Sequence, residues 1–382
     1  MIPYGRQSID EQDVAAVVEA LRSDWLTTGP RVDEFEAAVA RAAGTTHAVA
    51  VSSGTAALHA AMHVIDIGPG DEVVVPAMTF AATANAVVFQ GGTPLFADVD
   101  PDTLLIDAGS AAARITPRTK AIVGVDYAGQ PCDWDRLRAL AREHGLRLIA
   151  DACHSLGARV GGRPAAGLAD VACFSFHPVK HVTTGEGGAL VTDDPALAAR
   201  ARVFRNHGIS TDHRQRAEAG AWRYEMVELG FNYRITDIQC ALGTSQLRKL
   251  DAWVDRRRAI AARYDAAFAG VPGVEPLAVR DGAEPSWHLY PIRVDRAIRD
   301  AAFTGLRRAG IGVNVHYVPV HLHPFYRRRF GTGPGLCPVA ESQAERLLSL
   351  PMFPGLSDAD VEHVVRQVAS VLAGISPPRG EP

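Results

Sequence analysis

The sequence has few cysteines, and their spacing matches no disulfide or metal-binding pattern. The five cysteines, at positions 132, 153, 173, 240 and 337, never form a Cys-x-x-Cys pair. An odd number at such wide spacing indicates neither a disulfide framework nor a zinc site. We therefore expect no metal, and a reducing compartment fits best.

Long apolar runs and an excess of basic residues are lacking as well. No stretch approaches the roughly 18 apolar residues of a membrane helix. The start, MIPYGRQSIDEQD, lacks the basic and apolar regions of a signal peptide. The formal net charge of −4 gives no reason to expect nucleic acid binding. We expect a soluble, cytoplasmic protein with no membrane or nucleic acid partner.

The chain does have enough apolar side chain for sizeable cores. Hydrophobic residues make up 47% of the sequence and charged residues 21%, which is typical of a globular protein. Its 382 residues are too many for one ordinary core. We therefore expect a large domain and a smaller one.

Short β-rich runs alternate with helical patterns in the first part of the chain. HAVAVSS is followed by the helical pattern GTAALHAAMHV, and EVVVPAM is followed by ATANAVVFQ. This alternation predicts an α/β fold with a mostly parallel sheet sandwiched by helices. Residues 10–23, with acidic residues ahead of apolar positions at helical spacing, predict an N-terminal helix.

The pattern changes near residue 236, where a long helical stretch begins. Two strand candidates follow, residues 286–294 and 312–320, with a helical pattern between them and another at the end of the chain. We place the domain boundary close to residue 246, with a large domain at residues 1–245 and a small C-terminal α+β domain at residues 246–382.

Ligands of a parallel sheet bind at the carboxyl ends of its strands, so polar residues there are candidates for chemistry. Asp151 ends the apolar run LRLIA. A buried carboxylate is costly unless it meets a cation or a metal. Asp151 either caps a helix or holds a protonated ring nitrogen, with His154 one turn further on as a second contact.

A single lysine, Lys180, lies between two histidines in SFHPVKHVTTGEGG, directly after an apolar run. An ordinary lysine is a solvated surface charge. Here the following glycines allow close backbone approach, and the surroundings are apolar. An amine in such a place has its pKa lowered by desolvation, as a Schiff-base lysine requires.

Two further strand ends offer contacts for a ligand. Ser53, Gly54 and Thr55 open a helix, whose free N–H groups and positive dipole end bind anions such as phosphate. Plain helix capping explains them equally well. Phe80 follows the EVVVPAM strand and either stacks on a flat ring or packs in the core, which by itself is the commoner outcome.

Together these residues describe one ligand, a flat aromatic cation that carries a phosphate and an aldehyde. That ligand is pyridoxal 5'-phosphate (PLP). Its phosphate would go to the helix start and Ser175, its pyridinium nitrogen to Asp151 and its aldehyde to Lys180.

The sequence resembles the DegT/StrS-type sugar aminotransferases, which are fold type I PLP enzymes of the EC 2.6.1 class. The likeness covers nearly the whole chain and includes SSGTAALHAA, PAMTFAATANAV, DACHSLGA, SFHPVKHVTTGEGGALVT and GFNYRITDIQCALGTSQL. Within the family, VDYAG, SFHPVK, and WHLYP with VNVHYVPV look most like the UDP-sugar C4 aminotransferase of the pseudaminic acid pathway.

The resemblance implies a role for each matching residue. Lys180 would form the internal aldimine and then move the proton between substrate carbon and cofactor. Asp151 would keep the pyridine nitrogen protonated. His154, where many relatives have Gln, would lie near the hydroxyl of the ring.

The remaining cofactor contacts are also implied by the family. Gly54, Thr55 and Ser175 would hold the phosphate, and Phe80 would stack on the ring. Asn232 would reach the phosphate of the neighbouring subunit, so the active site would need a homodimer. Arg234 has less support as an anion contact, because a surface salt bridge would explain it as well.

The family also implies contacts to a sugar nucleotide. These residues are Tyr4, Asp24, Trp25, Leu26, Thr27, Asn314, Val315, His316 and Tyr317. The sequence departs from the pseudaminic enzyme at three of them. Asp24 and Trp25 stand where that relative has a basic and an amide residue, and Asn314 stands where it has Gln, so the identity of the sugar stays open.

The implied reaction has two stages. L-Glutamate would give its amino group to PLP, and that group would then pass to the C4 keto group of a UDP-linked 4-keto-6-deoxy sugar. The alternatives are a 3-keto sugar or a keto-cyclitol of an antibiotic pathway. A dehydratase of the same fold has histidine at the lysine position, and a catalytically silent regulatory protein would tolerate losses at Lys180, Asp151 or Asn232. All three residues are present.

Overall fold

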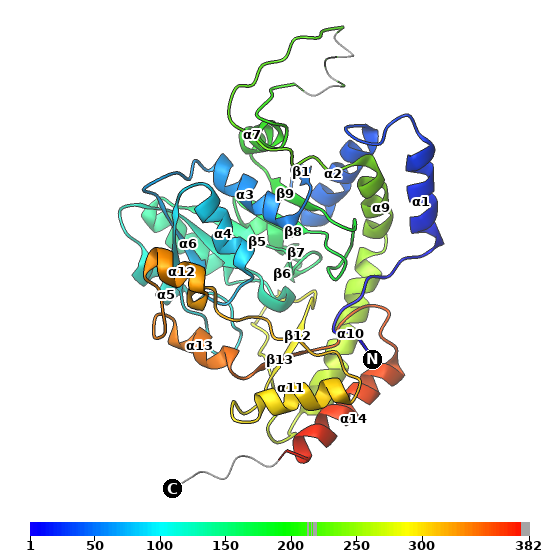
Figure 1. Cartoon of the computed structure of the whole chain (residues 1–382), viewed down its shortest axis with the longest axis vertical. Helices are drawn as coiled ribbons and strands as arrows, with labels where there is room; N and C mark the ends of the chain where they lie inside the picture. Colours follow the sequence, from blue (N-terminus) through cyan, green and yellow to red (C-terminus); the bar gives the residue numbers. More distant parts are fainter. Residues whose placement is uncertain (212–213, 215, 217–219, 376–382) are drawn as a thin grey trace.

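A seven-stranded sheet forms the centre of the larger part of the protein (Figure 1). The computed structural model describes residues 1–375 except 212, 213, 215 and 217–219. The sheet has the strand order β1-β9-β8-β5-β4-β2-β3. Its strands are β1 (His47–Val51), β2 (Glu72–Pro76), β3 (Thr93–Ala97), β4 (Thr119–Val125), β5 (Arg147–Asp151), β8 (Val171–Ser175) and β9 (Gly188–Thr192).

The sheet is mixed, because one strand runs against the others. β9 is antiparallel to both of its neighbours, β1 and β8. The strands from β8 to β3 pair in parallel. The prediction of a mostly parallel sheet is therefore confirmed, and the carboxyl ends of every strand except β9 point to the same edge.

Helices cover the sheet because its strands are apolar on both faces. β2 and β9 are buried along their whole length, which requires cover from both sides. The helices of this part are α1 (Glu11–Arg22), α2 (Pro30–Ala43), α3 (Gly54–Val64), α4 (Ala81–Phe89), α5 (Ala108–Arg114), α6 (Trp134–His144), α7 (Pro195–Arg205) and α9 (Asp237–Leu247). The predicted N-terminal helix corresponds to α1, which Asp10 and Asp13 open with a reciprocal capping box.

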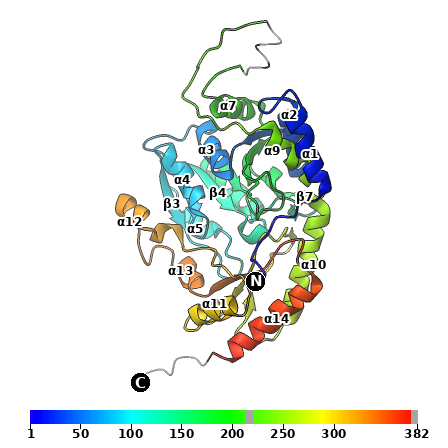
Figure 2. The same ribbon diagram turned by 45° about the vertical axis from the view of Figure 1, so that its right-hand side comes forward.

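A second, smaller sheet lies below the first in Figure 1. It has the order β10-β12-β13 and consists of β10 (Glu275–Pro276), β12 (Tyr290–Arg293) and β13 (Leu347–Leu350). Around it lie α10 (Leu250–Phe268), α11 (Arg299–Arg308) and α14 (Asp358–Ala373). Figure 2 shows α10 running down from the large sheet to this smaller part.

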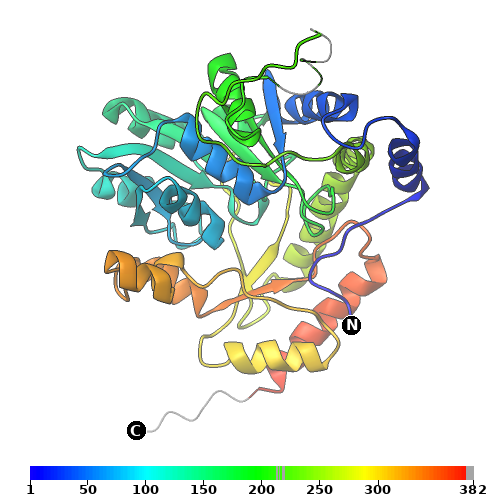
Figure 3. The ribbon, with the colours of Figure 1, turned by 45° about the horizontal axis from the view of Figure 1, so that its top comes forward.

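Shorter elements connect the two parts. They are β6 (Arg159–Val160), β7 (Arg163–Pro164), β11 (Ala283–Glu284), α12 (Pro324–Phe330) and α13 (Pro338–Ala344). The N-terminal segment before α1 also reaches the smaller part, as Figure 3 shows in dark blue. Ile2 forms a bridge with Ile311, and the Met352 N–H donates to the Tyr4 carbonyl at 2.9 Å.

Two sequence predictions of secondary structure are wrong. Residues 312–320 form no strand, and they meet the small sheet through an isolated bridge between Asn314 and Ser349. The segment instead crosses from the small part to the large part. There the Val320 N–H donates to the Ala77 carbonyl at 2.9 Å. The strands beside β12 are β10 and β13, which the sequence analysis did not identify.

The long helical stretch is also not one helix, since it breaks at Arg248 and Lys249 into α9 and α10. Side chains of α10 enter two hydrophobic clusters. Leu250 and Val254 belong to the cluster around the large sheet, and Tyr264 belongs to the cluster around the small one. The predicted domain boundary between residues 245 and 246 falls inside α9, and it stays a prediction.

Candidate active site

A cavity of about 580 Å³ opens at the carboxyl ends of the strands. It brings together most of the residues that the sequence analysis selected for a cofactor. They are Gly54, Thr55, Phe80, Asp151, His154, Ser175 and Lys180. These residues follow β1, β2, β5 and β8, whose common direction explains why they meet at one edge of the sheet.

Lys180 lies in the turn after β8, where its backbone N–H donates to the His177 carbonyl at 2.9 Å. Its side chain is half-buried and lines the cavity. Burial lowers the pKa of the Lys180 amine, against the opposing effect of Cys153 and Asp151. The amine is thereby moved toward the neutral form, which is the nucleophilic one.

Asp151 ends β5 and is only 5% exposed. Two donors hold its carboxylate. The Thr83 hydroxyl donates to Oδ2 at 2.6 Å, and the Cys153 N–H donates to Oδ1 at 3.2 Å. Thr83, from α4, is a residue that the sequence analysis missed. A fixed carboxylate beside the cavity is suited to pair with a cationic ring nitrogen.

The start of α3 combines the two roles that its sequence indicates, helix capping and anion binding. The Ser53 hydroxyl accepts from the Ala56 N–H at 3.1 Å and so caps the helix. Gly54 and Thr55 line the cavity together with Ser175. A Cβ at Gly54 would lie 2.7 Å from the Ser175 Cβ, so only glycine allows the two segments to approach. This leaves a cradle of helix N–H groups that suits a phosphate.

Phe80 is 61% exposed and precedes α4. The alternative that it packs in the core is therefore wrong. Its ring centroid lies 6.0 Å from that of Tyr317 across the cavity wall. An exposed aromatic face at this place is available to stack on a flat ring.

Several histidines surround the lysine. His154 is 5% exposed, and its Nε2 lies 3.1 Å from the Tyr317 hydroxyl. Burial lowers the pKa of His154 well below its ordinary value, so its imidazole is neutral at neutral pH. His177 lines the cavity, whereas His181 is buried beside the Ser286 carbonyl, with its Nε2 at 3.0 Å. His288, which the sequence analysis also missed, lies next to Lys180.

The opposite wall holds part of the predicted substrate site. Tyr4 and the segment Asn314–Tyr317 line the cavity. His316 is fixed by Ser349, with Nδ1 2.9 Å from its hydroxyl, and its ring centroid lies 5.3 Å from that of Tyr4. The segment that proved not to be a strand is therefore a wall of the cavity.

The other predicted contacts lie elsewhere in the chain. Asp24, Trp25, Leu26 and Thr27 do not line this cavity. Their turn lies against the start of α9, where the Asp237 N–H donates to the Leu26 carbonyl at 3.0 Å. Asn232 is exposed and forms a bridge with Asn206. Arg234 donates to the Asn206 side chain at 3.1 Å.

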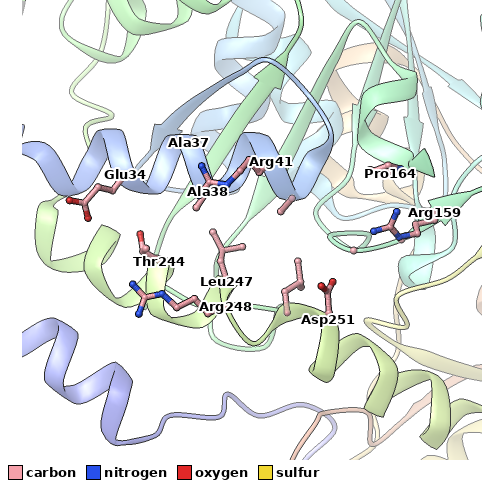
Figure 4. A pocket seen from close by; sticks show the side chains of 14 residues that line it. Glu34, Ala37, Ala38, Arg41, Arg159, Pro164, Thr244, Leu247, Arg248 and Asp251 are labelled. Carbon is pink, nitrogen blue, oxygen red and sulfur yellow. The ribbon is translucent and has the colours of Figure 1, made fainter. Parts of the chain in front are cut away.

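A second hollow is larger but has a different character. Figure 4 shows it as a groove between α2 and the α9–α10 junction, with a volume of about 720 Å³. Glu34, Arg41, Arg159, Arg248 and Asp251 line it, and all of them are exposed. Exposed charges on helix faces are ordinary surface.

The Lys180 cavity thus fits PLP, with an amine, a carboxylate, an exposed aromatic face and a cradle that a Cβ would fill. On this fold, such a site is that of a fold type I PLP enzyme. Residues 7–369 match the DegT/DnrJ/EryC1/StrS aminotransferase family. The chain belongs to this family and is a PLP-dependent sugar aminotransferase.

Individual relatives match almost from end to end. The spore coat polysaccharide biosynthesis protein SpsC of Bacillus subtilis is 41% identical over 379 residues, covering 98% of this chain and 97% of SpsC. Among solved structures, the PLP form of Spr1654 from Streptococcus pneumoniae has a TM-score of 0.91 at 33% identity, covering 97% of this chain and 98% of Spr1654. Helicobacter pylori PseC, an aminotransferase of pseudaminic acid biosynthesis, has a TM-score of 0.91 at 32% identity, covering 98% of this chain and 100% of PseC.

In the part of the chain that the structure describes, none of the helices combines the length and the apolar character that crossing a bilayer requires.

Proposed function

We propose that this enzyme moves the amino group of L-glutamate to the C4 keto group of a UDP-linked 4-keto-6-deoxy sugar. One observation carries the proposal. Lys180 and Asp151 share a cavity with Tyr4 and the segment Asn314–Tyr317, to which the family resemblance assigns the sugar nucleotide. The likeness to PseC over 98% of this chain supports an acceptor of this class.

The side chains divide the work between charge and position. When bound, PLP would supply an aldehyde carbon that takes up and releases the amino group and a ring that serves as electron sink. The Lys180 amine, whose pKa burial lowers, takes and returns the proton at the reacting carbon. Asp151 would hold positive charge on the ring nitrogen. Gly54 and Thr55 at the start of α3 would hold the phosphate, and Phe80 would orient the ring.

The proposal includes a homodimer with shared active sites. Asn232 does not line the cavity of its own chain, which agrees with a role at the cavity of a neighbouring subunit. Residues 220–231, which directly precede Asn232, project beyond α7 in Figures 1 and 2 and expose large apolar side chains, with Trp222 at 80% and Leu229 at 75%. Such a group of apolar side chains is typical of a surface that another chain covers.

The turn Asp24–Thr27 fits the same arrangement. The next residues, Thr28 and Gly29, line a small cavity together with Asn206 and Arg234. The turn and the projecting segment are therefore neighbours, and we propose that both act at the cavity of the partner subunit.

Complementation tests the shared site. Mixing Lys180→Ala protein with Asn232→Ala protein lets mixed dimers form one intact site, so activity should return to up to about a quarter of the wild-type value. Each variant alone should be inactive or severely impaired. No recovery, with subunit exchange confirmed by mass spectrometry of differently tagged chains, would show that sites are not shared.

Acceptor screening tests the substrate. The enzyme is incubated with L-glutamate and UDP- or TDP-linked 4-keto-6-deoxy sugars, a 3-keto sugar nucleotide or a free keto-cyclitol, and products are identified by mass spectrometry and NMR. Amination at C4 of the UDP-sugar supports the proposal. A faster reaction with the 3-keto sugar or the cyclitol rejects it and leaves the aminotransferase assignment intact.

A further inference from the structure

His288 is the side chain that faces the amine of Lys180. Its Nε2 lies 3.4 Å from the Lys180 Nζ. His288 is only 5% exposed, and its ring centroid lies 4.4 Å from that of His154. Its other nitrogen, Nδ1, is buried with no hydrogen-bond partner among the described residues. The polar end of this ring is therefore directed to one group, the lysine amine.

The backbone around His288 is fixed from two sides. The Ser286 N–H donates to the Gly129 carbonyl at 3.0 Å, and the Leu289 N–H donates to the Ala128 carbonyl at 3.3 Å. A Cβ at Gly129 would lie 2.8 Å from the His288 nitrogen, so this approach requires glycine. The histidine cannot shift without breaking these contacts.

The fixing group on the other side is a buried guanidinium. Arg257 of α10 is 0% exposed and donates to the Trp287 carbonyl at 3.1 Å and to the Met352 carbonyl at 3.0 Å. It has no carboxylate partner in the described part of the chain, so carbonyls alone hold its charge. A buried cation without a counter-ion is costly. Its presence here indicates that a fixed backbone around His288 is important to the protein.

The chemistry of the Lys180 amine and the His288 imidazole decides which of them accepts the hydrogen bond. An ammonium has donors only, so the facing Nε2 must accept whenever Lys180 is protonated. Burial lowers the pKa of His288 well below its ordinary value, so the ring is neutral and has a lone pair to offer. The other titratable or charged side chains around this pair are Asp151, Cys153, His154, His181, His316 and Arg257.

We propose that His288 is a positioning residue for Lys180: it accepts a hydrogen bond from the free amine and keeps that amine aimed into the cavity. The inference rests on the proposed function, in which Lys180 becomes free in each half-reaction and must return to the same place. The geometry assigns this task to His288, because it is the residue whose side-chain nitrogen lies within hydrogen-bonding distance of the amine.

The test measures the amine in apoprotein, without turnover. PLP is added to apoprotein at a series of pH values, and the rate of its covalent capture by Lys180 is followed by absorbance, with Lys180→Ala as the blank. In His288→Leu, which stays apolar but cannot accept, the plateau rate should fall about tenfold because the amine is no longer oriented. The pH midpoint should fall by about one unit, because the protonated amine loses a stabilising hydrogen bond.

Matched variants separate positioning from support of the fold. His288→Gln keeps an acceptor and should retain the wild-type midpoint. His181→Leu removes a neighbouring buried histidine that contacts Ser286 rather than the amine, and it should leave the midpoint unchanged. If His288→Leu fails to fold by circular dichroism, His288→Asn is measured in its place, with the same loss expected because the shorter side chain falls short of the amine.

The possible results distinguish the role of His288 from the proposed function. A midpoint and plateau unchanged in His288→Leu, or changed equally in His181→Leu, would overturn the role of His288 while leaving the cofactor assignment standing. Failure of wild-type apoprotein to capture PLP at Lys180 would instead overturn the proposed function and this inference together.

Discussion

The Lys180 cavity is smaller than the groove between α2 and the α9–α10 junction, but it holds the chemically useful side chains. The groove holds about 720 Å³ and the cavity about 580 Å³, yet only the smaller one encloses an amine, a carboxylate and histidines away from water. Volume alone therefore does not identify the active site. The chemistry follows from buried polar groups that several chain segments bring together.

The origin of the two hollows explains this difference. Glu34, Ala38 and Arg41 lie on one stripe of α2, so that wall of the groove is a single helix face. The cavity is made of strand ends and distant segments, where Asp151 and Lys180 meet residues near position 315. Burial there shifts pKa values, as it does for Lys180 and His288.

The largest effect is expected from Lys180→Ala. Removing the amine takes away both the covalent attachment of PLP and the proton carrier, so turnover should fall by more than about 10³-fold. The absorbance spectrum with PLP, before and after L-glutamate, checks this. Yellow, glutamate-bleached protein that persists in the variant would mean that the cavity is not where the chemistry occurs.

Asp151→Asn should come next. The amide keeps the shape of the side chain but no longer carries the charge that holds a protonated ring nitrogen. Breaking such a buried pair costs about 3–5 kcal/mol, or about 10²- to 10⁴-fold in rate. Steady-state kinetics measure the loss, and thermal melting confirms folding. A rate near that of the wild type would remove Asp151 from the mechanism.

Thr83→Val tests a smaller part of the same wall. The variant keeps the volume but removes the hydrogen bond that the hydroxyl gives to Asp151. Loss of a bond to a charged acceptor should lower kcat/KM about tenfold. Thr79→Val is the control, because Thr79 contacts Thr83 but not Asp151. Equal losses in both variants would point to packing of α4 instead.

The stability of the protein should also respond to pH, through the carboxyl of Asp126 directly after β4. Asp126 is 0% exposed, and burial raises its pKa to about 7. A raised folded-state pKa means that the stabilising contribution is present below about pH 4 and is lost as the pH rises through 7, at up to about 1.4 kcal/mol per pH unit. Asp126→Asn removes this loss.

Urea unfolding at pH 5 and pH 8 measures the effect. The amide can still accept from the Cys132 N–H and can donate to Ser155, the two partners of the carboxyl. The variant should therefore gain stability relative to the wild type at pH 8. The same substitution at the exposed Asp251 is the control, and an equal gain there would contradict the assignment to Asp126.

The smallest effect is expected in the groove. Arg41→Ala and Arg248→Ala remove exposed side chains that form no ion pair within the described residues, so kcat/KM should change less than about twofold. A tenfold loss in either variant would end the contrast between the two hollows and give the groove a function.

The sequence allowed the strand ends to be predicted because their apolar runs are short and each is followed by a polar residue. Asp151 and Lys180 could be selected on that basis alone. Thr83 and His288 could not, since one lies inside an apolar helix and the other inside an expected strand. Their importance depends on their partners in the folded protein, which are Asp151 for Thr83 and Lys180 for His288. Residues 312–320 misled for the same reason, because most of their apolar side chains line the cavity or pack in the two hydrophobic clusters without forming a strand.

The helix α10 has a consequence for anyone who wishes to dissect the protein. Leu250 and Val254 pack with the large sheet, whereas Tyr264 and Phe268, further along the same rigid rod, pack with the small one. A fragment ending at residue 245 would expose the apolar surface that α10 covers, and the complementary fragment would carry those side chains with nothing to bury them. Cooperativity between the two parts is thus built into one continuous helix.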